Sequence, residues 1–193
     1  MKHPIIDKWI KNGRRIPAPG EYKIQEILEY AQKYHISTFI ETGTHIGSTL
    51  NGVRGHFQRA YSIELNAKLY EHNIKRFDKY NNIYIFHGES EKVLPNILSK
   101  INEPCLFWLD AHYSGGNTCR GATDSALHAE LPIILEHQIK NHVILIDDTY
   151  HMVDQNGYIS VETATNMVKQ SLPEYNTKVD GYIFRATPPL EEK

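Results

Sequence analysis

Three aspartates follow two apolar segments of the chain and could together bind a cation. Asp110 ends the apolar run 105–109, and Asp147 and Asp148 end the run 142–146. Runs of this kind are typical of strands that are buried on both faces of a parallel sheet. A single aspartate there can simply cap the next segment, but three converging carboxylates would repel one another unless a cation neutralised them. Such oxygen ligands suit Mg²⁺, with Mn²⁺ or Ca²⁺ as alternatives.

A loop with two glycines follows an earlier strand, expected at 37–41, and leads into a helix. Its sequence is Glu41-Thr42-Gly43-Thr44-His45-Ile46-Gly47-Ser48-Thr49. Glycines let the backbone turn sharply and approach a ligand closely, and the start of a helix favours anionic groups. The loop is not a P-loop, because Gly-Lys-Ser/Thr is absent, and its glycines do not form Gly-x-Gly-x-x-Gly. An ordinary turn between strand and helix therefore stays open as an alternative.

Polar residues also end the next two predicted strands, at 59–64 and 83–86. Glu64 closes the first of them, where a carboxylate can accept hydrogen bonds from both hydroxyls of a ribose. The segment 87–91 follows the second and carries polar groups that could meet the edge of an adenine ring. The plain alternative is that these residues are only polar surface groups.

The surrounding pattern predicts the elements that position these residues. Five strand-like segments alternate with helical ones, which indicates a mostly parallel α/β sheet covered by helices. A helix over 160–172 precedes two strand-like runs joined by Asp180-Gly181, which predicts a hairpin and an antiparallel strand at the end of the sheet. Residues 1–20 carry two prolines and two glycines between 13 and 20, and we expect them to form an irregular arm.

Composition narrows the function classes. The chain has 193 residues, 40% of them hydrophobic, so it can bury a proper core. A net charge of −2 argues against nonspecific nucleic-acid binding or attachment to an anionic membrane, and no apolar run is long enough to cross a membrane. The two cysteines, one of them in an apolar run, suggest no disulfide framework, and we expect a cytoplasmic location.

The sequence resembles the class I S-adenosylmethionine (SAM)-dependent methyltransferases. Their Glu/Asp-x-Gly-x-x-x-Gly-x-Thr pattern is matched by Glu41, Gly43, Gly47 and Thr49, and the acid that ends their second strand is matched by Glu64. The resemblance covers about 21–186 and implies a Rossmann-like, doubly wound sheet of seven strands, of which the last is antiparallel. We therefore assign 21–193 to a methyltransferase domain and 1–20 to the arm.

The resemblance also implies roles for individual residues. Gly43 and its neighbours would hold the methionine part of SAM, Glu64 the ribose, and Glu89 and Ser90 the adenine. His45 either contacts the ligand or caps the helix. The predicted cofactor-binding residues are Glu41, Gly43, Thr44, His45, Gly47, Ser48, Thr49, Glu64, Glu89, Ser90 and Asp110.

The three aspartates are similar to those of one subgroup, the metal-dependent O-methyltransferases. Its macrocin and sugar O-methyltransferases have an Asp after the fourth strand and two acids in a row after the fifth, as in Asp110 and Asp147-Asp148. The family's strand order places these two strands side by side. The catechol type carries a basic Lys three residues after the fourth-strand Asp, whereas this chain has Tyr113 there.

The base must therefore be another residue. His112 is the first candidate, because it follows Asp110 closely and its ordinary pKa lies near neutrality. His151 is the second, although most histidines in such a chain are structural or face solvent. Tyr113 and Arg120, in the glycine-rich loop 113–123, are candidate substrate contacts; a mobile surface loop with a solvated Arg is equally compatible with this composition.

These observations predict a Mg²⁺-dependent O-methyltransferase that uses SAM and acts on a hydroxyl of a small molecule, such as a sugar or a natural-product intermediate. Two alternatives remain: a SAM- and metal-binding enzyme of another type, such as a hydroxylase, or a degenerate methyltransferase-like binding module. Nucleic acid is not an expected partner, because no Asn/Asp-Pro-Pro-Tyr-like motif follows the fourth strand. The short arm offers little cover for a substrate, so a homodimer partner is a further hypothesis.

Overall fold

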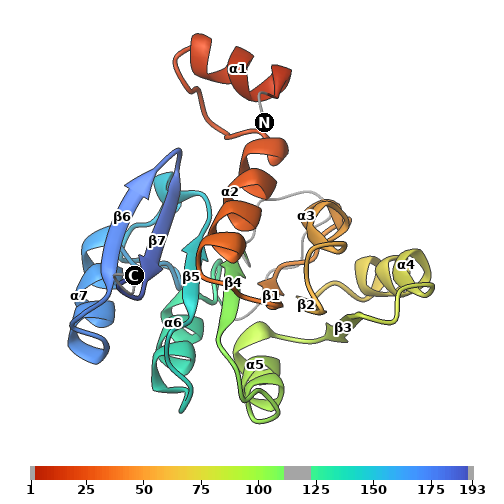
Figure 1. Ribbon diagram of the computed structural model, residues 1–193. Helices are drawn as coiled ribbons and strands as arrows, with labels where there is room; N and C mark the ends of the chain where they lie inside the picture. The colour runs from red at the N-terminus through yellow and green to blue at the C-terminus, as the bar shows by residue number, and fades with distance from the viewer. Residues whose placement is uncertain (1–2, 111–122, 191–193) are drawn as a thin grey trace.

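The computed structural model describes residues 3–110 and 123–190, which form a seven-stranded sheet with helices on both faces (Figure 1). The strand order is β3-β2-β1-β4-β5-β7-β6. The strands are β1 (Thr38–Thr42), β2 (Arg59–Glu64), β3 (Ile83–His87), β4 (Cys105–Leu109), β5 (Val143–Ile146), β6 (Asn176–Asp180) and β7 (Ile183–Thr187). The helices are α1 (Pro4–Lys11), α2 (Gly20–Lys33), α3 (Ser48–Val53), α4 (Ala67–Phe77), α5 (Ser90–Leu98), α6 (Leu127–Glu136) and α7 (Val161–Ser171), and a 3₁₀ turn, η1, spans Thr149–His151.

The pairing of the strands confirms the predicted doubly wound α/β fold. Strands β1 to β5 pair in parallel, whereas β7 runs antiparallel to both β5 and β6. The chain order reverses between β1 and β4, so this is the point where open α/β sheets bind ligands beyond the carboxyl ends of their strands. The predicted neighbourhood of the fourth and fifth strands is also confirmed: Phe107 of β4 is in register with Ile144 of β5.

Alternation along the central strands fills a separate core on each face of the sheet. Phe107 of β4 packs in the core shared with α5, α6 and α7, whereas its neighbours Leu106 and Trp108 pack in the core shared with α1 to α4. All three side chains have an exposed fraction of 0%. Burial on both faces explains why this strand is apolar throughout, and it makes Trp108 a core residue.

The predicted irregular arm is wrong for residues 4–11, which form helix α1. Pro4 stands at the start of this helix, where its missing N–H costs no hydrogen bond. Ile6 and Trp9 lie one helical turn apart and are both buried. The ring of Trp9 lies 4.8 Å from that of Tyr22 in α2. The arm therefore packs against the domain through this helix, and the boundary near residue 20 stays a prediction.

Two histidines form a hydrogen-bonded chain at the amino ends of β4 and β5. His142 Nδ1 accepts from the backbone N–H of Cys105 at 2.9 Å, which leaves the proton of His142 on Nε2. That nitrogen lies 3.0 Å from His137 Nδ1, and His137 Nε2 lies 3.1 Å from the carbonyl of Leu98. The chain is satisfied when both rings are neutral. Burial, aided by His137 and Lys140, lowers the pKa of His142 to about 4.

Over residues 3–110 and 123–190, the helices are too short or too polar for any of them to cross a lipid bilayer.

Candidate active site

The loop after β1 is tied to the neighbouring strand β2. The backbone N–H groups of Gly43 and Thr44 both donate to the carbonyl of Ile63, at 3.0 and 3.2 Å. The hydroxyl of Thr44 lies 2.6 Å from that of Ser62, which in turn donates to the buried carboxyl of Glu41 at 2.6 Å. Burial, partly offset by the Ser62 hydrogen bond, raises the pKa of Glu41 to about 8. A buried chain of hydrogen-bonded side chains thus holds the predicted cofactor loop in place.

Glu64, the predicted ribose ligand, is buried beside the same loop. Its Oε2 accepts the backbone N–H of His45 at 2.7 Å, and its Oε1 accepts that of Asn66 at 2.8 Å. Each carboxylate oxygen has a second lone pair for a ligand hydroxyl. The side chain of His45 itself is exposed. Glu64 therefore sets the path of the loop and stands where the resemblance requires an acid.

Gly47 is needed for packing as well as for its backbone conformation. Its φ is +74°, and a Cβ atom there would lie 2.5 Å from Asn73 Oδ1 and 2.7 Å from the ring of Phe77, both in α4. Asn73 also donates to the carbonyl of His45. The second glycine of the motif thus lets α4 lie directly against the loop.

The other predicted cofactor residues lie at the same edge of the sheet. Ser48 and Thr49 begin α3, with Ser48 exposed and Thr49 half-buried. Glu89 and Ser90 follow β3, where Glu89 pairs with Lys92 at 2.8 Å and Ser90 is buried. Because β1, β2 and β3 are parallel neighbours, their carboxyl ends bring all these residues to one edge.

The three aspartates converge as predicted. Asp110, Asp147 and Asp148 each offer a carboxylate oxygen, and these oxygens all lie within 4.8 Å of one another. The backbones of Asp110 and Asp147 continue the sheet, because their N–H groups donate to Thr42 and Leu109 at 3.1 Å. Such an all-oxygen donor set fits a hard divalent cation such as Mg²⁺.

An unusual backbone conformation allows consecutive aspartates to share one site. In an extended strand, neighbouring side chains point to opposite faces. Asp148, however, has a φ of +52°, in the left-handed region that Asp tolerates better than most residues. Its backbone N–H donates to Asp147 Oδ1 at 2.8 Å. The chain therefore bends at this residue, and both carboxylates face Asp110.

A lysine that the sequence analysis did not single out enters the cluster. The ammonium group of Lys23, from α2, forms an ion pair with Asp147 Oδ2 and donates to Asp148 Oδ1 at 3.2 Å. Burial would lower the pKa of Lys23, but the nearby carboxylates of Asp147, Asp110 and Asp148 raise it. Burial and the charge of Asp110 raise the pKa of Asp147 well above its ordinary value. One ammonium group thus only partly offsets three acids.

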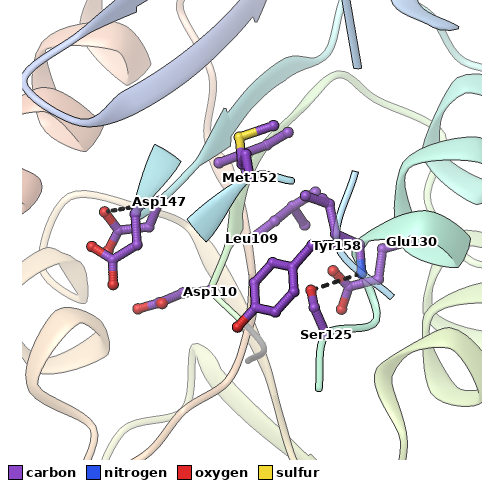
Figure 2. A pocket seen from close by; sticks show the side chains of 10 residues that line it. Leu109, Asp110, Ser125, Glu130, Asp147, Met152 and Tyr158 are labelled. Atoms are coloured by element: carbon purple, nitrogen blue, oxygen red, sulfur yellow. Dashed lines mark hydrogen bonds between the residues drawn. The ribbon is translucent and has the colours of Figure 1, made fainter. Parts of the chain in front are cut away.

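A small pocket is lined by the three aspartates and by residues that lie beyond Asp110 from Asp147 (Figure 2). Figure 2 shows Asp147 on one side of Asp110 and Tyr158 and Glu130 on the other. Glu130 of α6 is 1% exposed, and its Oε1 has no hydrogen-bond partner among residues 3–110 and 123–190. Burial raises the pKa of its carboxyl group to about 7, and the polar groups of Ser90 and Thr42 offset this rise in part. The apolar part of the lining includes Leu109, Leu127, Ile146 and Met152.

Of the predicted catalytic and substrate residues, Asp110 and His151 lie within the described residues. The ring of His151 lies tilted against that of Tyr150, with 4.4 Å between the ring centroids. Its centroid lies 6.0 Å from that of Tyr158, a residue of the pocket lining. His112, Tyr113 and Arg120 lie outside the described residues, so their roles stay predictions.

Sequence reasoning missed Lys23 and Glu130 for different reasons. Glu130 directly precedes the apolar stretch 131–135 of α6. An acid beside such a stretch on a helix is a usable signal of a buried polar site. Lys23 carries no such signal, because its partner Asp148 lies 125 residues away in the sequence.

Comparison with known proteins supports the fold. No family model and no curated protein matches the sequence. Among solved structures, an O-methyltransferase from Bacillus cereus in complex with SAH has a TM-score of 0.61 at 13% identity, covering 97% of this chain and 92% of that one. The O-methyltransferase TomG from Streptomyces achromogenes, in complex with SAM, has a TM-score of 0.60 at 11% identity, covering 98% and 92%.

An enzyme with another acceptor atom has the same fold. The N-methyltransferase NodS from Bradyrhizobium japonicum has a TM-score of 0.56 at 11% identity, covering 88% of this chain and 96% of that one. The likeness therefore shows the fold and does not by itself decide a reaction or an acceptor atom. This chain has the fold of the SAM-dependent methyltransferases of class I.

Proposed function

We propose that this protein is a Mg²⁺-dependent O-methyltransferase that transfers a methyl group from SAM to a hydroxyl of a small molecule, such as a sugar or a natural-product intermediate. The observation that carries the proposal is the convergence of Asp110, Asp147 and Asp148 at the sheet edge that also bears the glycine loop. A methyltransferase that acts on nitrogen has less need of such a cluster, because an amine is already a nucleophile.

The residues of this chain would mainly align the reactants. The loop 43–49 would hold the methionine part of SAM, and Glu64 the ribose. A divalent cation held by the three aspartates would supply positive charge that favours ionisation of the acceptor hydroxyl. An imidazole nitrogen of His112 would take the proton, with His151 as the second candidate. Most of the rate would come from placing the acceptor oxygen in line with the methyl carbon and the sulfur.

The pocket beside Asp110 is the proposed position of the acceptor. Its apolar lining suits the carbon frame of a small molecule, and Glu130, Ser125 and Tyr158 supply polar groups. Tyr113 and Arg120 would add contacts from the segment between β4 and α6. We include a cytoplasmic location and a homodimer that completes the pocket in this proposal; light scattering of the purified protein tests the latter.

Calorimetry and a methyl-transfer assay test the function. We expect SAM and SAH to bind, and labelled methyl groups to move from SAM to a hydroxylated acceptor in a reaction that EDTA stops and Mg²⁺ restores. Absence of SAM binding at millimolar concentration would refute the methyltransferase proposal. Methyl transfer that continues unchanged in EDTA would refute its metal-dependent part.

A further inference from the structure

We propose that Lys23 is a built-in competitor for the divalent cation: its ammonium group closes the acid cluster, and the cation binds by displacing the Lys23 side chain into solvent. This inference rests on the proposed metal site, but it concerns a residue that the site's chemistry does not require. It makes Lys23 the residue that sets how tightly the cluster holds a cation.

The hydrogen bonds of Asp147 are the first reason. Its side chain is 0% exposed, and its Oδ1 accepts the backbone N–H of Asp148 at 2.8 Å. Its other oxygen, Oδ2, is in ion-pair contact with Lys23. The same ammonium group reaches Asp148 Oδ1 at 3.2 Å. Lys23 thus occupies oxygens on two of the three acids that a cation would use.

Charge is the second reason. Three carboxylates so close together carry a strong mutual repulsion, and Lys23 relieves part of it in the absence of metal. A divalent cation that touched the same carboxylates beside a bound ammonium group would place like charges within a few ångströms of each other. That arrangement is unfavourable in a buried site, so the two cations compete for the same carboxylate oxygens.

The way in which α2 is held is the third reason. Arg185 of β7 donates through Nε to Glu26 of α2 at 3.0 Å, and through a terminal nitrogen to the hydroxyl of Tyr22 at 3.2 Å. Tyr22 also packs tightly on the hairpin turn, because a Cβ atom at Gly181 would lie 2.4 Å from its hydroxyl. The helix backbone is therefore fixed, and displacement must occur in the side chain of Lys23.

That side chain has the means to move. It is 15% exposed, so it borders solvent, and its four-carbon stem has several rotatable bonds. Displacement by the cation then costs the ion pairs of one ammonium group, which becomes hydrated, and replaces its single positive charge at the three carboxylates with two.

Metal affinity of the whole 193-residue chain tests the competition. We compare Lys23→Met with wild type and with Lys33→Met, a control on the same helix whose ammonium group lies 5.8 Å from the ring of Tyr30 and 5.5 Å from that of Tyr34. With SAH present, calorimetry with Mn²⁺ should show binding on the order of tenfold tighter or more in Lys23→Met and unchanged in Lys33→Met. Mn²⁺ should also raise the melting temperature more in Lys23→Met than in wild type.

A crystal structure of the wild-type protein with Mn²⁺ tests the displacement itself. We expect anomalous density between the three aspartates, with Lys23 turned into solvent. Density there with Lys23 still on Asp147 would overturn the proposal, as would equal or weaker Mn²⁺ binding by Lys23→Met, or no binding by either protein. SAH binding in the same samples separates the two failures: if SAH binds but the metal results fail, this inference falls and methyl-donor binding stands.

Discussion

Gly47 lies so close to Asn73 of α4 that a Cβ atom at Gly47 would stand 2.5 Å from the side-chain oxygen of Asn73. The glycine of the motif therefore serves helix packing as much as ligand approach. The loop, α4 and the carboxyl end of β2 act as one packed unit in the described structure.

We expect Gly47→Ala to destabilise the protein by about 2 kcal/mol, because the methyl group clashes with α4 and the left-handed backbone disfavours alanine. SAH affinity should fall with it. Urea unfolding and calorimetry measure the two effects. Gly55→Ala is the matched control, since a Cβ atom there would have no neighbour within 4 Å in the described part of the chain. Equal stability of the two variants would contradict this account of Gly47.

Asp147→Asn should abolish binding of Mn²⁺ at the acid cluster while leaving SAH binding intact, because Asn keeps the shape but removes one of three negative charges. Methyl transfer should then fall on the order of a hundredfold or more. Asp78→Asn, an exposed change at the end of α4, is the control outside the cluster. If Asp147→Asn still bound Mn²⁺, the metal would have to be held by other residues.

The histidine chain predicts loss of stability in mild acid. Because folding lowers the pKa of His142 from 6.5 to about 4, the unfolded state binds more protons between these values. The free energy of unfolding should therefore fall as pH drops through this window, by on the order of 2 kcal/mol from this group. Urea unfolding at pH 7, 6, 5 and 4.5 measures it.

His142→Asn should flatten that acid dependence, at a lower stability at pH 7, because Asn offers an acceptor to Cys105 but cannot take up the extra proton. His72→Asn, an exposed change in α4, should leave the pH profile as in wild type. An unaltered profile in His142→Asn would rule out His142 as the source.

The raised pKa of Glu130 predicts the opposite dependence of stability on pH. Its pKa rises from 4.5 to about 7 on folding, so the folded state binds more protons between these values and stability falls as pH rises. Glu130→Gln, which is neutral at every pH, should be more stable than wild type at pH 8 and should reduce this slope. Glu136→Gln, exposed at the end of the same helix, should not. Thermal unfolding between pH 5 and 8 checks both.

Much of the fold was predictable because its signals are local. Asn66 caps α4 by accepting from the backbone N–H groups of Lys68 and Leu69, and Ser160 caps α7 in the same manner. Runs of apolar residues indicated β4 and β5, and Asp180-Gly181 indicated the final hairpin. Helix α1 was missed because the prolines and glycines after it outweighed the helical spacing of Ile6 and Trp9.

The site was predictable only in part. The type and order of Asp110, Asp147 and Asp148 pointed to a shared cation site, because parallel strands end at one edge. The left-handed turn at Asp148 that lets two consecutive side chains converge has no clear local signal. The position of Lys23 depends on how α2 packs on β7, which is decided by contacts between residues far apart in sequence.

The strands β4 and β5 join two polar centres at opposite ends. The carboxyl ends carry the acids, and the amino ends carry the ring-to-ring pair of His137 and His142. The proposed cation site and the predicted source of acid sensitivity thus lie at distant ends of the same two strands. An engineer who wished to widen the pH range over which this protein stays folded could redesign the histidine end and leave the acid cluster untouched.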